Sequence, residues 1–255
     1  MNSLRRMLAV LELLRPDRPT LEVDDICRLL DYAPATAYRY VRELVDVGLL
    51  VRLPGGYGLG PRIIEFDLLI RETDPLLNRS RDLVAALAAQ TGLNVLLSEL
   101  YDDKVVTIHQ EQGADAQALN FGRGRPMPLF RSATSRVILA WLPARRLRRV
   151  HDTHAQAPEL HALGADWKSF TRAMLEVRRQ GWCLSRGELD SDKTGLAAPI
   201  FDDRQRVLGS VTLVGRHERF AAFDDGRLVG LITAAGREIT QRMAAGGPAE
   251  RLVGR

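Results

Sequence analysis

The sequence predicts an α+β protein made of two domains joined by a helix. Near the N-terminus, two short helical patterns separated by a three-residue turn precede a glycine-rich pair of strands. Further along, antiparallel strand patterns alternate with helices, which is typical of a sheet with helices packed against it. An Asp74-Pro75 break separates the two regions. We therefore place a first domain at residues 1–60, a linker helix at 61–74, a second domain at 75–245 and a disordered tail at 246–255.

The composition is that of a chain with hydrophobic cores, since 45% of its residues are apolar. No apolar run approaches the ~20 residues of a membrane span, and no charged-then-apolar leader precedes the first helix. Two cysteines, Cys27 and Cys183, are too few for a disulfide framework or a zinc site, which favours a reducing cytoplasm. Net charge is +4, but residues 1–60 hold eight Arg against eight Asp or Glu, so bulk charge does not locate a nucleic-acid-binding part.

The first predicted helix, from Ser3 to Leu14, supports two helices that follow it. Residues 23–30 form a short amphipathic helix, with Asp24 where a side-chain oxygen would cap free backbone N–H groups. Asp31 to Ala33 is a tight turn before the next helix.

That next helix is expected from Pro34 to about Val47, ended by Gly48. One face consists of Ala37, Val41 and Leu44 and should pack against Ile26 and Leu29. The other face carries small, hydroxyl, aromatic and basic side chains, namely Ala35, Thr36, Tyr38, Arg39 and Arg42. Such side chains reach phosphates and base edges, so the pattern favours DNA binding over protein docking, the alternative use of such a module.

Two short strands, residues 49–53 and 57–59, are predicted around Pro54-Gly-Gly56. With the preceding helices they make a winged helix-turn-helix. The wing adds Arg52, Gly55, Gly56 and Tyr57 to the candidate DNA contacts.

Pro61 begins the linker helix, which is apolar on more than one side. A connector needs only one apolar stripe, so the surplus indicates that a partner chain covers Ile63, Phe66 and Ile70. The alternative is a helix buried against its own domain.

The second domain is predicted to contain helices and strands in alternation. We expect helices at 76–90, 132–142, 144–154, 167–180 and 224–243, and strands at 94–100, 105–111, 182–185, 196–201 and 207–214.

Six segments resemble the IclR family of bacterial transcriptional regulators, and together the resemblance covers roughly Ser3 to Ala245. They are Ala35-Thr-Ala-Tyr-Arg39, Leu44 to Leu49 around Gly48, Gly56-Tyr-Gly-Leu-Gly60, Gly122 to Ala140, Leu196 to Asp202 and Val207 to Leu213. The family's properties imply a GAF-like second domain that binds a small effector, a linker helix that pairs chains, and a dimer of dimers. They also imply effector contacts at Ala133, Thr134, Ser185, Gly195, Thr212 and Val214. There are two departures from the family's pattern: Phe130 stands where histidine is common, and Ser185-Arg186 stands where an acidic pair is frequent. The second departure leaves the ligand's polarity open.

Together with this resemblance, the residues at the start of the helix expected from Ser132 favour an acidic effector. Ser132 lies at a helix N-cap, so the amides of Ala133, Thr134 and Ser135 are expected to face outward unbonded and to bind a carboxylate. Apolar neighbours Leu129, Leu184 and Leu213 would surround the carbon skeleton. Glu188 argues against an anion if it points inward, and a Ser132 that merely caps its helix is the alternative.

No catalytic, cofactor or metal site is predicted. His151, Asp152 and His154 lack a further ligand, Cys183 lacks a neighbouring base, and Gly122 to Pro126 opens no nucleotide-binding unit. We expect a cytoplasmic, ligand-responsive regulator, not an enzyme, that binds a near-palindromic double-stranded operator as a dimer or tetramer. An enzyme or a protein-docking module that carries a winged helix is the alternative.

Overall fold

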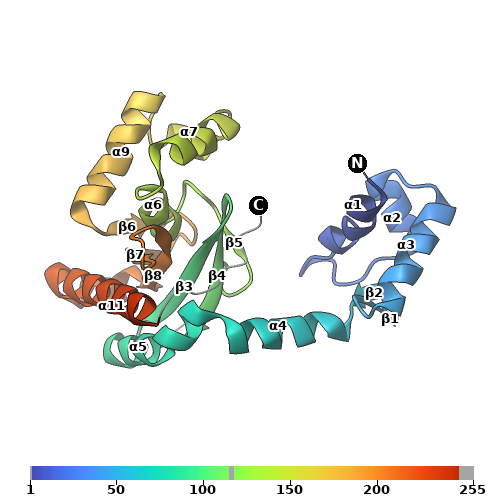
Figure 1. The fold of residues 1–255 in the computed structure, drawn as a ribbon, viewed down its shortest axis with the longest axis horizontal. Helices are drawn as coiled ribbons and strands as arrows, with labels where there is room; N and C mark the ends of the chain where they lie inside the picture. Colours follow the sequence, from blue (N-terminus) through green and yellow to red (C-terminus); the bar gives the residue numbers. More distant parts are fainter. Residues whose placement is uncertain (1, 115–117, 247–255) are drawn as a thin grey trace. The chain divides into compact units, whose positions relative to one another are not determined.

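The computed structural model describes residues 2–114 and 118–246, and its elements are shown in Figure 1. The chain divides into two compact units, Met1–Asp74 and Pro75–Arg255. The disordered tail expected at 246–255 lies, apart from Gly246, outside the described residues.

The first unit is helical with one small hairpin. Its elements are α1 (Ser3–Leu8), the 3-10 helix η1 (Leu11–Leu13), α2 (Val23–Leu30), α3 (Pro34–Asp46), β1 (Leu50–Leu53), β2 (Gly56–Leu59) and α4 (Pro61–Thr73). The helix expected from Ser3 to Leu14 is therefore too long, since it ends at Leu8 and gives way to a 3-10 turn.

Two details of α2 differ from expectation. Glu22, not Asp24, occupies the N-cap position, and Asp24 lies inside the helix. Leu29 is exposed, because the stripe that α2 turns to the core runs through Val23 and Ile26, and Leu29 lies off it.

Helix α3 matches its prediction closely. Ala37, Val41 and Leu44 are buried in the core of this unit together with Ile26. Gly48 has φ +77°, the left-handed conformation that ends helices and favours glycine. The wing is an antiparallel pair that starts from this point.

Helix α4 has no buried residue, so it is not a helix buried in its own domain. Its most exposed apolar side chain is Ile64, at 73%. Ile63 is half-buried, and Phe66 and Ile70 are exposed.

The second unit is built around a six-stranded antiparallel sheet in the order β5-β4-β3-β8-β7-β6. Its elements are α5 (Pro75–Thr91), β3 (Asn94–Tyr101), β4 (Lys104–Glu111), β5 (Pro126–Met127), α6 (Ala133–Leu139), α7 (Ala144–Thr153), α8 (Pro158–His161), α9 (Trp167–Gln180), β6 (Cys183–Arg186), β7 (Lys193–Phe201), β8 (Val207–Arg216), α10 (His217–Ala221) and α11 (Asp225–Ala245). The sequence missed β5, α8 and α10, which are too short to produce a periodic signal.

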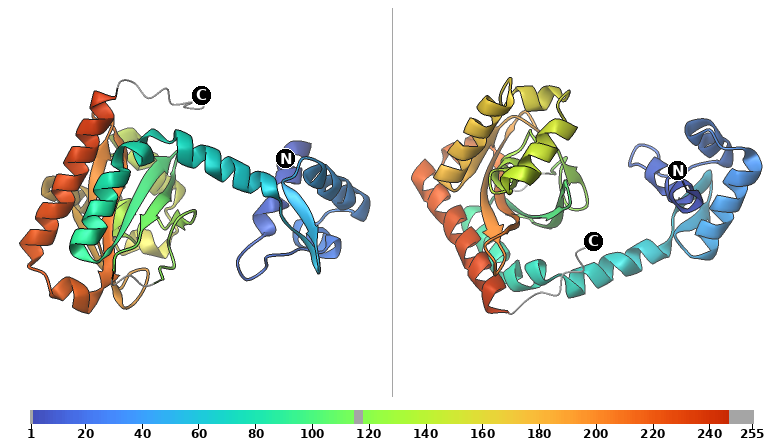
Figure 2. Two further views of the ribbon diagram at one scale, coloured as in Figure 1. Left: turned by 90° about the horizontal axis from the view of Figure 1, so that it is seen from below. Right: turned by 45° about the horizontal axis from the view of Figure 1, so that its top comes forward.

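Helices cover both faces of the sheet (Figures 1 and 2). On one face α5 and α11 pack over β3, β7 and β8 around a core that includes Val95, Val211 and Ile232. On the other face α6 lies against β7 and β8, with α9 behind it. This confirms the α+β class and leaves the start of α6 next to the middle of the sheet.

Candidate functional site

The outward face of α3 carries the side chains that the sequence singled out. Ala35, Tyr38, Arg39 and Arg42 are exposed, Tyr38 to 58%, while Thr36 is half-buried. The Arg39 guanidinium lies 5.4 Å from the centre of the buried Tyr40 ring. Arg42 Nε is 3.7 Å from Asp46 Oδ2, a weak exposed pair that leaves the guanidinium available.

The wing is joined to the helical core through Tyr57. Its backbone exchanges hydrogen bonds of 2.9 and 3.0 Å with Leu21, while Arg52 and Gly55 at the tip are exposed. Gly55 and Gly56 both have positive φ, as the tight turn requires. The α3 face and the wing tip therefore offer donors and an aromatic ring, the groups that DNA-reading modules use.

A pocket that is partly open to solvent lies between the sheet and the start of α6. Of the expected effector positions, Ser132, Ala133, Thr134, Ser185, Gly195, Thr212 and Val214 line it. Leu129 and Ser135 do not: Leu129 packs against two clusters of buried apolar side chains, and Ser135 is fully buried within α6. We call this space the effector cavity.

Hydroxyl groups dominate the polar part of the effector cavity. Ser132 caps α6 as predicted, its Oγ accepting the Ser135 amide at 3.0 Å. Ser185 Oγ accepts the Ala133 amide at 3.3 Å. The expectation of free amides is therefore wrong for Ala133 and Ser135. Because each serine oxygen already accepts an N–H, each retains its own O–H hydrogen as a donor.

Two of the expected apolar walls lie elsewhere because side chains alternate along a strand. Thr212 and Val214 face the effector cavity, so Leu213 between them points to the core on the opposite face. Leu184 packs against that same opposite core. The actual apolar wall consists of Leu96, Leu119, Phe121, Met127 and Leu189.

The sequence reasoning missed most of this wall. Leu96 pairs with Thr212 across β3 and β8, a partnership that strand pairing alone could have suggested had the order been known. Leu119 and Phe121 belong to the segment between β4 and β5, for which the sequence predicted neither strand nor helix. Thr194 and Lys193 were also missed.

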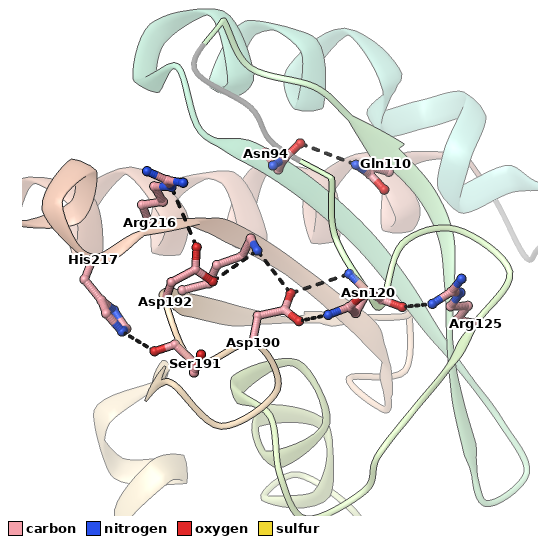
Figure 3. Close-up of polar contacts among 10 residues, drawn as sticks. Asn94, Gln110, Asn120, Arg125, Asp190, Ser191, Asp192, Arg216 and His217 are labelled. Carbon is pink, nitrogen blue, oxygen red and sulfur yellow. Dashed lines mark hydrogen bonds and ion pairs between the residues drawn. The ribbon is translucent and has the colours of Figure 1, made fainter.

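Asp190 and Lys193, which line the cavity, belong to a group of polar side chains joined by hydrogen bonds and ion pairs (Figure 3). Asp190 lies 3.5 Å from Lys193 Nζ and accepts hydrogen bonds from the side chain and backbone of Asn120. Lys193 also lies 3.3 Å from Asp192, and this hydrogen bond holds the pKa of Asp192 below its usual value. Asp190 thus ties the segment after β4 to the segment before β7.

Glu188 lines the cavity, as the argument against an anion required, but it does not stand alone. Its Oε1 is 2.5 Å from a terminal nitrogen of Arg136 on α6. The carboxylate is therefore compensated by a positive charge.

Within residues 2–114 and 118–246, no cluster of three His, Cys, Asp or Glu is placed to hold a metal ion. None of the helices in that part of the chain is both long and apolar enough to cross a membrane. Burial raises the pKa of the Cys183 thiol, which opposes formation of a nucleophilic thiolate.

Comparison with known proteins identifies both units. The IclR helix-turn-helix domain matches residues 3–54, and the family described as bacterial transcriptional regulator IclR C-terminal matches residues 71–241. The chain is 27% identical to the glycerol operon regulatory protein of Streptomyces coelicolor, over 96% of this chain and 97% of that one. It is 24% identical to the HTH-type transcriptional regulator XynR of Escherichia coli, over 83% of this chain and 84% of that one.

Solved structures share the fold. The crystal structure of an IclR homolog from Microbacterium hydrocarbonoxydans, complexed with 4-hydroxybenzoate, matches with a TM-score of 0.77 and 22% identity, over 96% of this chain and all of that one. The family consists of transcriptional regulators, not enzymes. With both family domains matched in order along one chain, the protein belongs to the IclR family of bacterial transcriptional regulators.

Proposed function

We propose that this protein is a ligand-responsive transcriptional regulator whose effector is a small organic acid. The effector cavity carries the proposal, because a module that only bound DNA would need no partly enclosed pocket, lined by hydroxyl and apolar side chains, in a second domain. The matching relative complexed with 4-hydroxybenzoate, an aromatic carboxylate, supports an acid of comparable size.

The chemistry of the cavity supports an acid on independent grounds. Ser132 and Ser185 each use the oxygen to accept an amide, so each presents an O–H donor. Phe121 and Met127 offer an apolar surface for a carbon skeleton or ring. Converging donors beside an apolar wall suit a ligand whose oxygens accept hydrogen bonds.

On DNA, the first unit would read a half-site with α3 in the major groove and the wing on the backbone. Two chains would pair through Ile63, Phe66 and Ile70 of α4, and the exposure of Phe66 and Ile70 in the single chain supports a covered role. Two-fold symmetry then requires a near-palindromic operator, bound by a dimer or a dimer of dimers in the cytoplasm. Effector binding would change operator affinity by linkage through α4.

The test is footprinting of the DNA upstream of the protein's own gene, with and without 4-hydroxybenzoate, benzoate and pyruvate. We expect a protected, near-palindromic region whose extent or affinity changes with at least one acid. Absence of any protection in every condition would contradict the DNA-binding role. If a Tyr38 substitution abolished binding to a protein partner while no DNA was ever shifted, the docking alternative would hold.

A further inference from the structure

The charges that line the effector cavity do not by themselves suit an anion. Among the described lining residues, Glu188, Asp190 and Lys193 are the charged ones, two carboxylates against one ammonium. Their formal sum is −1. Lys193 is already engaged with Asp190 and with Asp192 outside the lining. A cavity with this wall alone would repel a carboxylate.

One further cation corrects this balance from behind the wall. Arg136 does not line the cavity, but its terminal nitrogen lies 2.5 Å from Glu188 Oε1 and 3.3 Å from the Leu184 carbonyl oxygen. The two side chains are 13% and 29% exposed, so water screens the pair only partly. With Arg136 included, the formal sum becomes zero.

A second arginine provides a natural comparison. Arg131 also contacts Glu188, but its guanidinium donates to the backbone carbonyl oxygen and not to the carboxylate. Arg131 therefore holds the position of the loop, whereas Arg136 neutralises the charge that faces the cavity. The two roles are separable by substitution.

We propose that Arg136 is a specificity-determining residue that allows the effector cavity to accept an anion by neutralising Glu188. This inference rests on the proposed function, in which the effector is a carboxylate. Arg136 touches no ligand in this account and acts through Glu188. Loss of Arg136 leaves the negative charge of Glu188 uncompensated. That charge then repels the carboxylate of an acid but not a neutral molecule of the same shape.

The test compares an acid with its neutral amide on matched variants of the full chain. Isothermal titration identifies the tightest of benzoate, 4-hydroxybenzoate and pyruvate on the wild type, and then measures that acid and its amide. Arg136→Met should weaken the acid roughly 30-fold, the factor for a unit charge about 8 Å away at an effective dielectric constant near 20. The affinity for the amide should change little, and Arg136→Lys should keep the wild-type affinity for the acid.

Restoring the local charge balance should restore the affinity for the acid. The double variant Arg136→Met with Glu188→Gln returns the local sum to that of the wild type, so its affinity for the acid should recover. Glu188→Gln alone should increase the affinity for the acid. Arg131→Met, which removes the same charge from the protein, should leave the ratio of acid to amide affinity unchanged.

The outcomes separate the two proposals. If the wild type binds the acid and Arg136→Met binds it equally well, the inference on Arg136 is wrong while the acid effector stands. If Arg136→Met weakens acid and amide alike and Glu188→Gln does not rescue it, Arg136 is only structural. If the wild type binds amides but none of the acids, the proposal that the effector is a carboxylate is wrong. Should Arg136→Met fail to fold, Glu188→Gln alone still decides, because an unchanged acid affinity would overturn the inference.

Discussion

The hydroxyl oxygens of Thr134 on α6 and Thr212 on β8 lie 3.0 Å apart, although 78 residues separate them in the chain. Both side chains are buried and both line the effector cavity. This hydrogen bond joins the start of α6 to the centre of the sheet, and so fixes the position of Ser132 and Ala133 against Ser185.

Thr212→Val removes one partner of this hydrogen bond and leaves the Thr134 hydroxyl buried and unpaired. We expect a loss of about 1–3 kcal/mol in the free energy of unfolding, measured by urea denaturation. The double variant Thr134→Val with Thr212→Val should recover part of that loss, because neither hydroxyl then remains unpaired. Additive losses in the double variant would show that the two groups do not interact.

Gly195 keeps the effector cavity open. A Cβ at this position would lie 3.1 Å from Ser185 Oγ, 3.9 Å from Ala133 Cβ and 4.0 Å from Thr212 Cγ2. Gly195→Val should therefore abolish the increase in melting temperature that an aromatic acid such as 4-hydroxybenzoate gives. The increase given by pyruvate, a smaller acid, should fall by less. Gly230→Ala is the control, because a Cβ added there would meet no heavy atom within 4 Å beyond its chain neighbours and its own helix backbone. This variant should respond to the acids as the wild type does. An undiminished response of Gly195→Val to 4-hydroxybenzoate would place the ligand elsewhere.

Arg39 and Arg42 should differ in what they read. If Arg39 contacts a base, Arg39→Ala costs about 1–3 kcal/mol at the operator and relaxes preference at one position. If Arg42 contacts phosphate, Arg42→Ala weakens all DNA alike and lowers the salt slope by about one. Gel-shift titrations over a range of salt concentrations measure both, with Arg28→Ala on α2, which pairs with Asp25, as the control. Wild-type operator affinity after substitution of both residues would remove α3 from the DNA interface.

Phe66 tests the pairing of chains through α4. Phe66→Glu places a charge on an exposed apolar position, so it should lower the dimer fraction seen by analytical ultracentrifugation and the cooperativity of operator binding. Glu65→Lys, a charge change at the neighbouring exposed residue, should leave the mass unchanged. If Phe66→Glu retains the wild-type mass and cooperativity, α4 is not the dimer interface.

Asp202 predicts how stability responds to acid. Desolvation raises its pKa, but hydrogen bonds from the backbone and side chain of Arg206 and from the Arg204 amide outweigh it, so the pKa lies below its usual value. A depressed folded-state pKa contributes stability above the unfolded pKa and loses it as pH falls through the folded value. Asp202→Asn should therefore be about 1–2 kcal/mol less stable at pH 7, with a difference that shrinks below about pH 4. Thermal unfolding at several pH values checks this, and a difference independent of pH would contradict it.

Local patterns in the sequence determined much of the first unit. The three- and four-residue spacing of Ala37, Val41 and Leu44 predicted which side of α3 is buried, and therefore that Tyr38 and Arg39 face outward. Gly48 predicted where the helix ends. Such features depend on neighbours within one or two turns of helix, which the sequence displays directly.

The Asp24 cap and the Leu29 contact both failed, although the predicted bounds of α2, residues 23–30, are the observed ones. A capping residue is fixed by where the chain leaves its extended conformation, and here that point falls at Glu22. Which residues of an amphipathic helix meet the core depends on how that helix packs, and here the buried stripe runs through Val23 and Ile26 and leaves Leu29 exposed.

The effector cavity shows what only the tertiary structure decided. Ser132 could be placed at a helix start from local chemistry, but its neighbours could not, because β8 is inserted between β3 and β7 in the sheet. That order puts Leu96 opposite Thr212, and the alternation of side chains on β8 sends Leu213 to the other face. The charge of the cavity likewise depends on Arg136 meeting Glu188, 52 residues away. Residue type and spacing do not encode such meetings, because they arise only when the strands have paired and the helices have packed.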